Sequence, residues 1–355
     1  MTFQLRTRQG LVAAMMLVPF LAGISRALPQ EPERTDPAGS APFRTRRIEI
    51  RYSFRIQDLE PDAREVWVWI PVPPTNDHQR VISVIPPDGS WTALLSEEEF
   101  GNRYLLFDLD RDGGPDQRTD RLTTTFRIER SSYRVPAADP PAAAPSEVAA
   151  AAGLTTWLKP DTLVPIDGPV AQEAWKIVRD AGSPLDRARR IYEHLISTVT
   201  YDKSGTGWGR GDALFACSAR RGNCTDFHSL FIGEARAVGL PARFIMGVAL
   251  PRARWALPTS SGGGVITGYH CWAEFHVDGL GWVPVDASEA HKDPRRRDEL
   301  FGGLEADRVQ FTLGRDIALP RARSGRLNYS IHPHVEVDGA LHESRELQLE
   351  FRDLD

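Results

Sequence analysis

The feature that most constrains this chain is a helix that must begin at a cysteine. Residues 221–228 read Arg-Gly-Asn-Cys-Thr-Asp-Phe-His. Gly222 and Asn223 are a turn and capping signal, and apolar residues then recur at helical spacing until residues 239–241, Gly-Leu-Pro, end the pattern. These apolar residues are Phe227, Leu230, Phe231, Ala235 and Val238. We therefore predict a helix that buries one side and points its N-terminus, with Cys224, at a cleft.

A cysteine at a helix start is a candidate nucleophile. A thiol reacts at neutral pH only when its thiolate is stabilised. The first turn of a helix does this with free backbone N–H groups and the positive end of the helix dipole. Cys224 occupies such a position in the predicted helix. The sequence therefore predicts Cys224 as the reactive thiol.

A β-hairpin is predicted after this helix. Residues 270–277 are rich in aromatic and β-favouring types, residues 278–281 (Asp-Gly-Leu-Gly) turn the chain, and residues 282–286 run back. The hairpin begins at His270 and ends at Asp286. A histidine and a carboxylate are the residue types of a base and of the group that orients it.

The register of the hairpin decides whether His270 and Asp286 can meet. A four-residue loop would put Asp286 on the sheet face away from His270. A five-residue loop from Val277 to Gly281 puts Asp286 on the same face, diagonal to His270. We therefore predict the longer loop or a bulge. In that register Asp286 can hold one imidazole nitrogen while the other faces Cys224.

Four segments carry a combined motif. They are Gly-Asn-Cys-Thr-Asp-Phe-His-Ser-Leu-Phe (222–231), Gly-Leu-Pro-Ala-Arg-Phe (239–244), Tyr-His-Cys-Trp-Ala-Glu-Phe (269–275) and Gly-Trp-Val-Pro-Val-Asp-Ala-Ser-Glu-Ala (281–290). Together they resemble the core of the transglutaminase-like superfamily, specifically its bacterial exported members. The resemblance covers about residues 186–293. It implies a papain-like α+β core and a catalytic triad, here Cys224, His270 and Asp286.

The resemblance leaves the reaction open, because the superfamily includes cross-linkers, peptidases, deamidating enzymes and inactive members. We expect a cysteine-dependent enzyme that acts on carboxamide or peptide bonds through a thioester: a transglutaminase, peptidase or amidase. The alternative is a non-catalytic binding or scaffold protein that retains the fold. In an enzyme, the Cys224 N–H and a side chain from Tyr201 or Trp208 could stabilise the oxyanion. Both aromatic residues could equally be packing residues.

No metal or cofactor is expected. Cys224 and His228 are four residues apart on the predicted helix and could share a face, and His270, Cys271 and His276 add possible ligands. The spacing lacks the paired cysteines or the His-Glu-His helix of strong zinc signals. No acidic cluster has the spacing of a calcium loop. His228 is expected to pack beside the nucleophile or to modulate its charge.

The other two cysteines, Cys217 and Cys271, have two possible fates. They could form a disulfide in an oxidising compartment, or both could be small buried hydrophobic residues. In the predicted strand Cys271 points away from the His270 face, which disfavours a second catalytic thiol there.

The N-terminus predicts export. In residues 1–27, Arg6 and Arg8 precede an apolar stretch at 11–24, and small residues follow before a plausible cut. The fourteen apolar-stretch residues are broken by Pro19 and are too few to span a membrane comfortably. We expect a signal peptide, a periplasmic or extracellular protein, and no stable membrane span after processing. An uncleaved anchor is the alternative.

Net charge disfavours nucleic acid as a partner. Removing residues 1–27 takes away three arginines and no acidic residue, so the formal charge moves from −5 to −8. The basic run Arg295-Arg296-Arg297 lies between Asp293 and Asp298, and we predict a neutralised, solvated loop. The expected partner is a protein or peptide substrate, possibly in the cell envelope. The oligomeric state is left open.

Periodicity divides the mature chain into an α+β protein with two domains. Five alternating segments predict an antiparallel β-domain at 44–135: residues 48–56, 66–70, 80–85, 104–109 and 122–128. A flexible leader at 28–43 precedes it, and an Ala/Pro-rich linker at 136–152 follows. The catalytic domain is placed at 153–355.

Within the catalytic domain, helices are predicted at 170–181 and 186–199, packed beside the Cys224 helix. Short strands are predicted near the C-terminus, where they would complete a sheet or dock the two domains. They lie at 311–313, 327–331, 335–337 and 347–351.

Overall fold

The computed structural model describes residues 44–87, 92–109, 121–135, 153–251 and 262–354. The predicted signal peptide, leader and linker, at 1–27, 28–43 and 136–152, lie outside the described residues. In the described part, no helix combines the length and apolar character that crossing a membrane requires. Antiparallel sheets and a group of helices confirm the α+β class.

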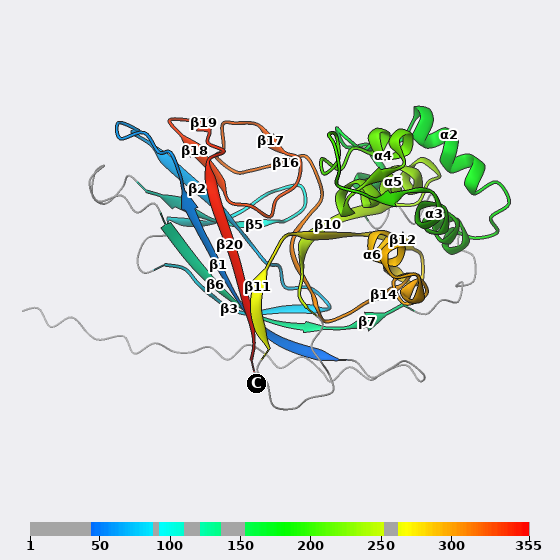
Figure 1. Ribbon diagram of the computed structural model, residues 1–355, viewed down its shortest axis with the longest axis horizontal. Helices are drawn as coiled ribbons and strands as arrows, with labels where there is room; N and C mark the ends of the chain where they lie inside the picture. The colour runs from blue at the N-terminus through cyan, green and yellow to red at the C-terminus, as the bar shows by residue number, and fades with distance from the viewer. Residues whose placement is uncertain (1–43, 88–91, 110–120, 136–152, 252–261, 355) are drawn as a thin grey trace, which may run out of the picture. The chain divides into compact units, whose positions relative to one another are not determined.

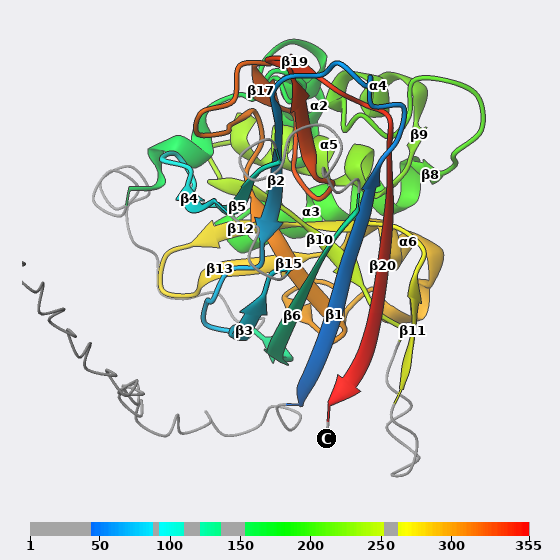
Figure 2. The same cartoon turned by 90° about the vertical axis from the view of Figure 1, so that its left-hand side faces the viewer.

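One five-stranded antiparallel sheet has the order β11-β20-β1-β6-β3. Its strands are β1 (Thr45–Ile56), β3 (Gln79–Ile85), β6 (Arg121–Ser131), β11 (Gly263–Ile266) and β20 (Arg345–Leu354). The C-terminal strand β20 runs beside β1 over its whole length, as Figures 1 and 2 show. The first and last described strands are therefore neighbours.

A second five-stranded sheet has the order β19-β18-β2-β5-β4. Its strands are β2 (Val66–Val72), β4 (Ala93–Ser96), β5 (Arg103–Asp108), β18 (His334–Val337) and β19 (Ala340–Leu341). The inward residues of both sheets belong to one apolar cluster, as expected for sheets that pack face to face. All five strands predicted in 44–135 are present. The C-terminal strands join the sheets that these strands form, and the predicted domain limits stay a prediction.

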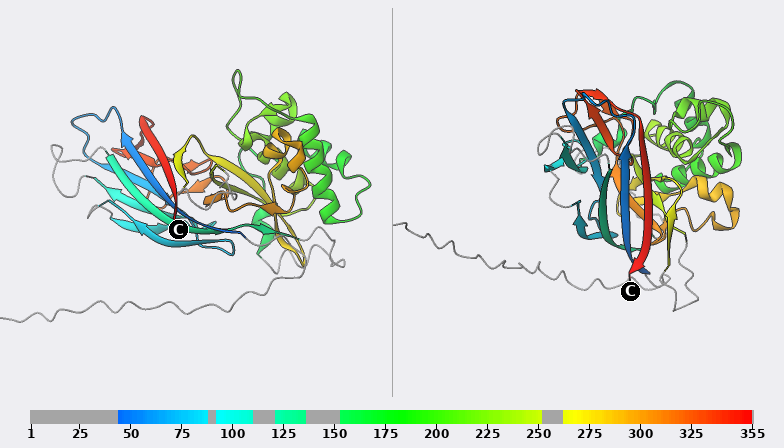
Figure 3. Two further views of the ribbon diagram at one scale, coloured as in Figure 1. Left: turned by 60° about the horizontal axis from the view of Figure 1, so that its bottom comes forward. Right: turned by 60° about the vertical axis from the view of Figure 1, so that its left-hand side comes forward.

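The helices surround α5 (Cys224–Ala237), which contacts four other α-helices of the described residues. These are α2 (Gly168–Ile177), α3 (Pro184–Thr198), α4 (Ala213–Ala219) and α6 (Ala287–Lys292). The views of Figure 3 agree that the helices gather together. The predicted packing of α2 and α3 beside the cysteine helix is confirmed. Helix α4 lies just after the glycine-rich loop and was not predicted.

A four-stranded antiparallel sheet of order β13-β12-β10-β15 lies against α5. It comprises β10 (Ala242–Ala249), β12 (His270–Val277), β13 (Gly281–Val285) and β15 (Arg308–Leu313). Short pieces complete the fold: β7 (Tyr133–Arg134), β8 (Thr200–Tyr201), β9 (Arg221–Gly222), β14 (Gly303–Leu304), β16 (Ile317–Ala318), β17 (Arg326–Leu327), and the 3-10 helices η2 (Leu154–Leu158) and η3 (Pro294–Arg296).

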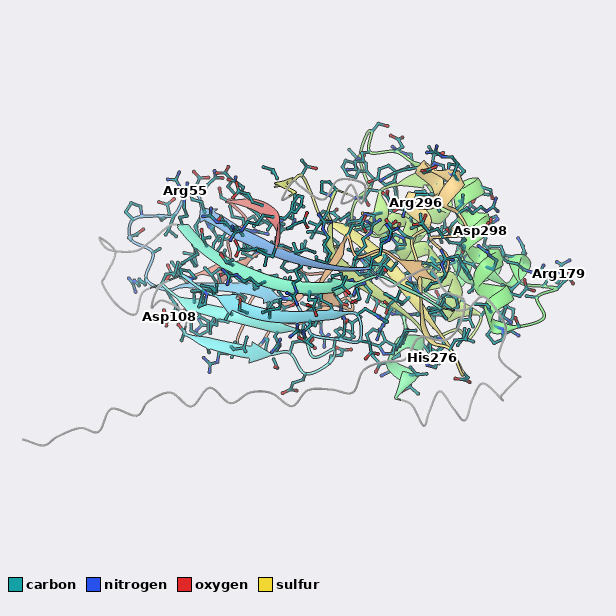
Figure 4. The ribbon with its side chains drawn as sticks, turned by 90° about the horizontal axis from the view of Figure 1, so that it is seen from below. Arg55, Asp108, Arg179, His276, Arg296 and Asp298 are labelled. Atoms are coloured by element: carbon teal, nitrogen blue, oxygen red, sulfur yellow. The ribbon has the colours of Figure 1, made fainter. Side chains whose placement is uncertain are left out.

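The basic run at 295–297 is matched by acidic neighbours. Arg295 pairs with Asp293 at 2.8 Å, and Arg296 pairs with Glu299 at 2.6 Å. Arg297 pairs with Glu193 of α3. Figure 4 labels Arg296 and Asp298 in the helical part. These ion pairs support the prediction of a neutralised loop rather than an anion-binding site.

Candidate active site

A capping box fixes the start of α5 at Cys224. Asn223 Oδ1 accepts a hydrogen bond from the Thr225 backbone N–H at 2.9 Å, and Asp226 Oδ2 accepts one from the Asn223 backbone N–H at 2.9 Å. Each side chain thus satisfies a donor that the helix leaves free. The predicted helix start is confirmed, and Cys224 is its first residue.

Asp226 also ties the upstream glycine-rich loop to this helix start. Its carboxylate accepts hydrogen bonds from the backbone N–H groups of Gly209, at 2.7 Å, and Gly211, at 2.9 Å. Both glycines have positive φ angles, 87° and 66°, which favour glycine. The loop that precedes the nucleophile candidate is therefore held by the same carboxylate that caps its helix.

The hairpin has the predicted register. Val277 pairs with Gly281, and Ala273 pairs with Val285. Continued by one residue, this register puts Asp286 opposite Trp272, as the five-residue loop requires. The strand ends one residue earlier than predicted, because Asp286 is the N-cap of α6.

The hairpin brings the three predicted site residues together. His270 Nε2 lies 2.7 Å from Asp286 Oδ2. This leaves Nδ1 of His270 for Cys224, and the imidazole is close enough to lower the pKa of the thiol. Cys224, His270 and Asp286 are all buried, with exposed fractions of 2%, 6% and 0%. A helix start and the two ends of a hairpin thus meet in one buried row.

The charges of this row stabilise one another. The pKa of Cys224 lies well below its usual range. A hydrogen bond from Cys271 lowers this pKa most; burial raises it, and His270 lowers it further. Burial acts to lower the pKa of His270, but the Asp286 carboxylate outweighs burial and raises this pKa to about 9. Burial opposes ionisation of Asp286 as well, yet His270 holds the pKa of Asp286 well below its usual range. A thiolate, an imidazolium and a carboxylate therefore coexist at neutral pH.

Sequence reasoning missed most of the partners of Asp286. Ser288 Oγ donates to Asp286 Oδ1 at 3.0 Å, and Arg308 Nη2 donates to Oδ2 at 3.2 Å. His228 Nε2 lies 3.5 Å from Oδ1. Arg308 is a buried arginine on β15, and only the pairing of β15 with β10 brings it to the site. No local pattern marks such a residue.

Cys271 lies beside Cys224. It faces away from the His270 side of β12, as predicted, but α5 covers that face: Phe275, on the same face, packs against Phe231 of α5 with ring centroids 6.0 Å apart. Cys271 Sγ lies 3.5 Å from His228 Nδ1, and burial together with the neighbouring Cys224 raises the pKa of Cys271 well above its usual range. His228 is fully buried beside the nucleophile candidate, where it was expected.

All three cysteines are free and buried, so Cys217 and Cys271 form no disulfide in the structure. Cys217 instead donates to Glu173 Oε2 at 3.1 Å. Cys224, Cys271, His228 and Asp286 lie close together. Even so, among the described residues no group of three or more His, Cys, Asp or Glu side chains has an arrangement that could hold a metal ion.

Of the two candidate oxyanion donors, Tyr201 is the better placed. Trp208 Nε1 already donates to the Gly205 carbonyl at 3.1 Å. Tyr201 lies near the sulfur: burial raises the pKa of its phenol, and the charge of Cys224 raises it further. The Lys292 ammonium lies over the Tyr201 ring, 3.7 Å from its centroid, and donates its hydrogen bond to Glu289 Oε1 at 2.7 Å.

The class of protein follows from this core. Residues 172–287 match the family model of the transglutaminase-like superfamily. This range contains α5 and the hairpin, and with them Cys224, His270 and Asp286. The chain is therefore a protein with a transglutaminase-like core, as the motif resemblance implied.

Three individual proteins are similar to this chain. An uncharacterized protein of Haemophilus influenzae is 28% identical over 299 residues, which cover 77% of this chain and 80% of the relative. The structure of a candidate cysteine protease from Cytophaga hutchinsonii superposes with a TM-score of 0.55 at 15% identity, covering 88% of this chain and 93% of that one. The periplasmic domain of TgpA from Pseudomonas aeruginosa is 12% identical with a TM-score of 0.35, covering 70% and 90%. The Cytophaga structure thus shares the fold over most of both chains.

Proposed function

We propose that this protein is an exported cysteine-dependent enzyme that acts on carboxamide or peptide bonds through a thioester intermediate. The observation that carries the proposal is the 2.7 Å contact of His270 Nε2 with the buried Asp286 carboxylate, with Cys224 on the other side of the ring. A thiol at a helix start, a base and an orienter in hydrogen-bonding contact are the arrangement that nucleophilic catalysis needs. The transglutaminase-like core supports the same chemistry.

In the first half-reaction the Cys224 thiolate attacks the substrate carbonyl carbon, and a C–S bond forms. The His270 Nδ1–H then protonates the departing amine as the C–N bond breaks. Asp286 remains ionised and holds the Nε2–H of the ring, which keeps Nδ1 directed at the reacting atoms. The product of this step is a thioester on Cys224 and a free amine.

In the second half-reaction His270 accepts a proton from the incoming nucleophile, which attacks the thioester carbonyl. The C–S bond breaks and returns the thiolate of Cys224. Water gives a carboxylic acid, so the protein would be a peptidase or amidase, whereas a primary amine gives a new amide, so it would be a transglutaminase. Both routes use the same three side chains.

The oxyanion of each tetrahedral intermediate needs two donors. As the first helical residue, Cys224 has a backbone N–H with no acceptor inside its helix. We assign the second donor to the Tyr201 hydroxyl, because the Trp208 N–H is engaged with Gly205. Preorganised donors of this kind contribute a large share of the rate in acyl transfer.

The test is a burst assay with a panel of chromogenic peptide anilides. One equivalent of amine should be released as Cys224 becomes acylated, and Cys224→Ser should abolish the burst. Cys217→Ala, a buried cysteine outside the site, is the matched control and should behave as wild type. Normal turnover by Cys224→Ser would refute the proposal. Tyr201→Phe should slow acylation by roughly 10²–10³-fold.

Hydrolysis and transfer are separated by incubation with a fluorescent primary amine and cell-envelope extract. Covalent labelling of envelope proteins that depends on Cys224 identifies a transglutaminase and its protein substrates. Release of amines without labelling identifies a peptidase or amidase. Recovery of a mature chain that lacks residues 1–27 from the periplasmic or culture fraction would support export, whereas a full-length membrane-bound chain would contradict it.

One observation favours the non-catalytic alternative: the Cys224 residue is only 2% exposed. Selective alkylation separates the two functions. Iodoacetamide should modify Cys224 at neutral pH and spare Cys217, whose pKa is raised to about 12 by burial and the Glu173 carboxylate. A Cys224 that resists both alkylation and acylation would favour a binding or scaffold protein.

A further inference from the structure

Asp286 has two hydrogen-bond donors on each of its carboxylate oxygens. Oδ1 accepts from the Ser288 hydroxyl at 3.0 Å and from the Glu289 backbone N–H at 3.0 Å. Oδ2 accepts from His270 Nε2 at 2.7 Å and from Arg308 Nη2 at 3.2 Å. The imidazole and the guanidinium therefore share one oxygen, and the two half-reactions give the guanidinium no role.

The sheet fixes Arg308 in this position. Arg308 is the first residue of β15 and pairs with Ala249, the last residue of β10. The register of the two strands shifts between Met246 and Gly247, and the strands approach closely there, because a Cβ added to Gly247 would overlap the Val309 carbonyl oxygen. The backbone of Arg308 is therefore held by a strand ladder, and its side chain reaches Asp286 from the sheet.

Arg308 also has a second acidic partner. Its Nη1 donates a hydrogen bond to Asp307 Oδ1 at 3.0 Å. Asp307, Arg308 and Asp286 are all buried. Charges in a buried site act on one another more strongly than charges in water do. One guanidinium is thus divided between two carboxylates, one of which also holds His270.

We propose that Arg308 is a positioning residue that weakens the hold of Asp286 on the His270 proton, and that Asp307 limits this effect by partly neutralising the guanidinium. A positive charge at Oδ2 reduces the attraction that the carboxylate exerts on the imidazolium. An imidazolium that is held less tightly gives its proton more readily to the departing amine. This inference rests on the proposed function, in which His270 is the acid and base.

The charges of these groups agree with the arrangement. Burial lowers the pKa of His270, Asp286 raises it and Arg308 lowers it, with a result of about 9. Burial acts to lower the pKa of Arg308 as well, but Asp307 and Asp286 raise it, so the guanidinium stays charged. The other titratable groups that act on His270, Asp286 or Arg308, and that every variant below keeps, are Tyr192, Cys224, His228, Cys271, Glu289 and Arg296.

The experiment measures the pKa of His270 by NMR titration of protein with isotope-labelled histidine, and the signal is assigned by its loss in His270→Gln. Arg308→Gln removes the positive charge, so the pKa of His270 should rise by about one pH unit or more. Arg308→Lys keeps the charge and should stay close to wild type. Asp307→Asn should lower the pKa of His270, because the guanidinium then acts on Asp286 alone.

Arg236→Gln is the matched control. Arg236 is also a buried arginine paired with a carboxylate, Asp161 at 2.8 Å, but it lies in the last turn of α5. Its replacement should leave the pKa of His270 unchanged.

A titration of Arg308→Gln that superimposes on wild type would overturn the inference, as would shifts of the same sign in Arg308→Gln and Asp307→Asn. Should Arg308→Gln fail to fold by circular dichroism, Asp307→Asn decides the question, because it keeps the guanidinium. In that variant, an unchanged or raised pKa of His270 would refute the inference.

Failure of this inference is distinguishable from failure of the proposed function, because the NMR titration needs no substrate. If peptide anilides give a burst and the pKa of His270 does not respond to Arg308, only the role of Arg308 is wrong. If the pKa shifts as expected and no substrate gives a burst, the proposed function is wrong and the positioning role falls with it. In an active enzyme, the alkaline limb of kcat/KM should move with the NMR value in each variant.

Discussion

At the scale of single residues, the site depends on a carboxylate that burial alone would neutralise. Asp286 is fully buried, and it is kept ionised by the imidazole of His270 and the guanidinium of Arg308, with the Ser288 hydroxyl as a further donor. A buried carboxylate with several donors is held in one geometry, because losing a donor leaves one of its hydrogen bonds unmade in a buried site. The rigid carboxylate in turn keeps His270 protonated beside Cys224.

This geometry predicts a bell-shaped pH profile for kcat/KM. Cys224 acts as a thiolate, so activity rises as pH passes upward through its lowered pKa. His270 acts as an imidazolium, so activity falls as pH passes about 9. The pKa values of the two limbs describe Cys224 and His270 together, because the two groups titrate as a coupled pair. Asp286→Asn should move the alkaline limb down by at least about one pH unit, because the carboxylate is what raises the pKa of His270. An alkaline limb that stays near pH 9 in that variant would contradict this account.

At the scale of elements, α5 is a helix buried on nearly every side, although it carries several polar residues. Most of these have partners: Asp226 accepts from loop N–H groups, and Arg236 pairs with Asp161 at 2.8 Å. Glu234, by contrast with these paired residues, is fully buried, and neither of its oxygens hydrogen-bonds to any described residue. Burial raises the pKa of Glu234 well above its usual range, and the nearby Glu173 raises it further.

Glu234→Gln is therefore predicted to stabilise the protein at alkaline pH. The folded state holds Glu234 protonated, whereas the unfolded chain ionises it above a pKa of about 4.3. Stability is thus lost as pH rises above that value, by about 1.4 kcal/mol per pH unit until the folded pKa is reached. The variant should gain unfolding free energy at pH 8 and little at pH 4, as measured by urea denaturation.

The matched control is Glu173→Gln, for which the opposite sign is expected. Burial opposes ionisation of Glu173, but hydrogen bonds from His194, Arg220 and Cys217 lower its pKa to about 2. The ionised carboxylate therefore adds stability above the unfolded pKa, and this is lost as pH falls toward 2. Glu173→Gln should destabilise the protein at pH 8. If both variants change the unfolding free energy at pH 8 by the same amount and in the same direction, Glu234 is not a protonated carboxyl in the folded protein.

At the scale of the whole molecule, strands near the end of the described chain pair with strands near its beginning. β20 pairs with β1 on one side and with β11 on the other, and β18 pairs with β2. Segments from both ends of the sequence therefore share sheets. Because each strand supplies half of a ladder of hydrogen bonds, changes near residue 350 affect strands near residue 50.

Leu349→Ala tests this dependence. Leu349 is 5% exposed, pairs with Tyr52 of β1 and faces the large apolar cluster. Its truncation should cost about 2–5 kcal/mol of unfolding free energy. Gln348→Ala, on the exposed face of the same strand, is the control and should change stability by less than about 0.5 kcal/mol. Thermal unfolding of the two variants side by side checks the prediction, and equal midpoints would count against it.

Local patterns predicted much of this molecule. Asn223 and the apolar spacing behind it set the start of α5, and alternation marked the strands of 44–135. The Asp-Gly-Leu-Gly turn marked the hairpin but allowed two registers, and the longer loop was chosen because it lets His270 and Asp286 meet. The seven-residue helix α4 was missed because it is too short for a clear period.

The sequence by itself determined most of the helices and strands, and where the cysteine helix begins. It could do so because capping, turn chemistry and alternation act between residues a few positions apart. Only the tertiary structure decided that β20 lies against β1, that Arg308 reaches Asp286 and that Cys271 contacts His228. Such contacts join residues far apart in the chain, and they depend on how all buried surfaces pack at once, which no local period encodes.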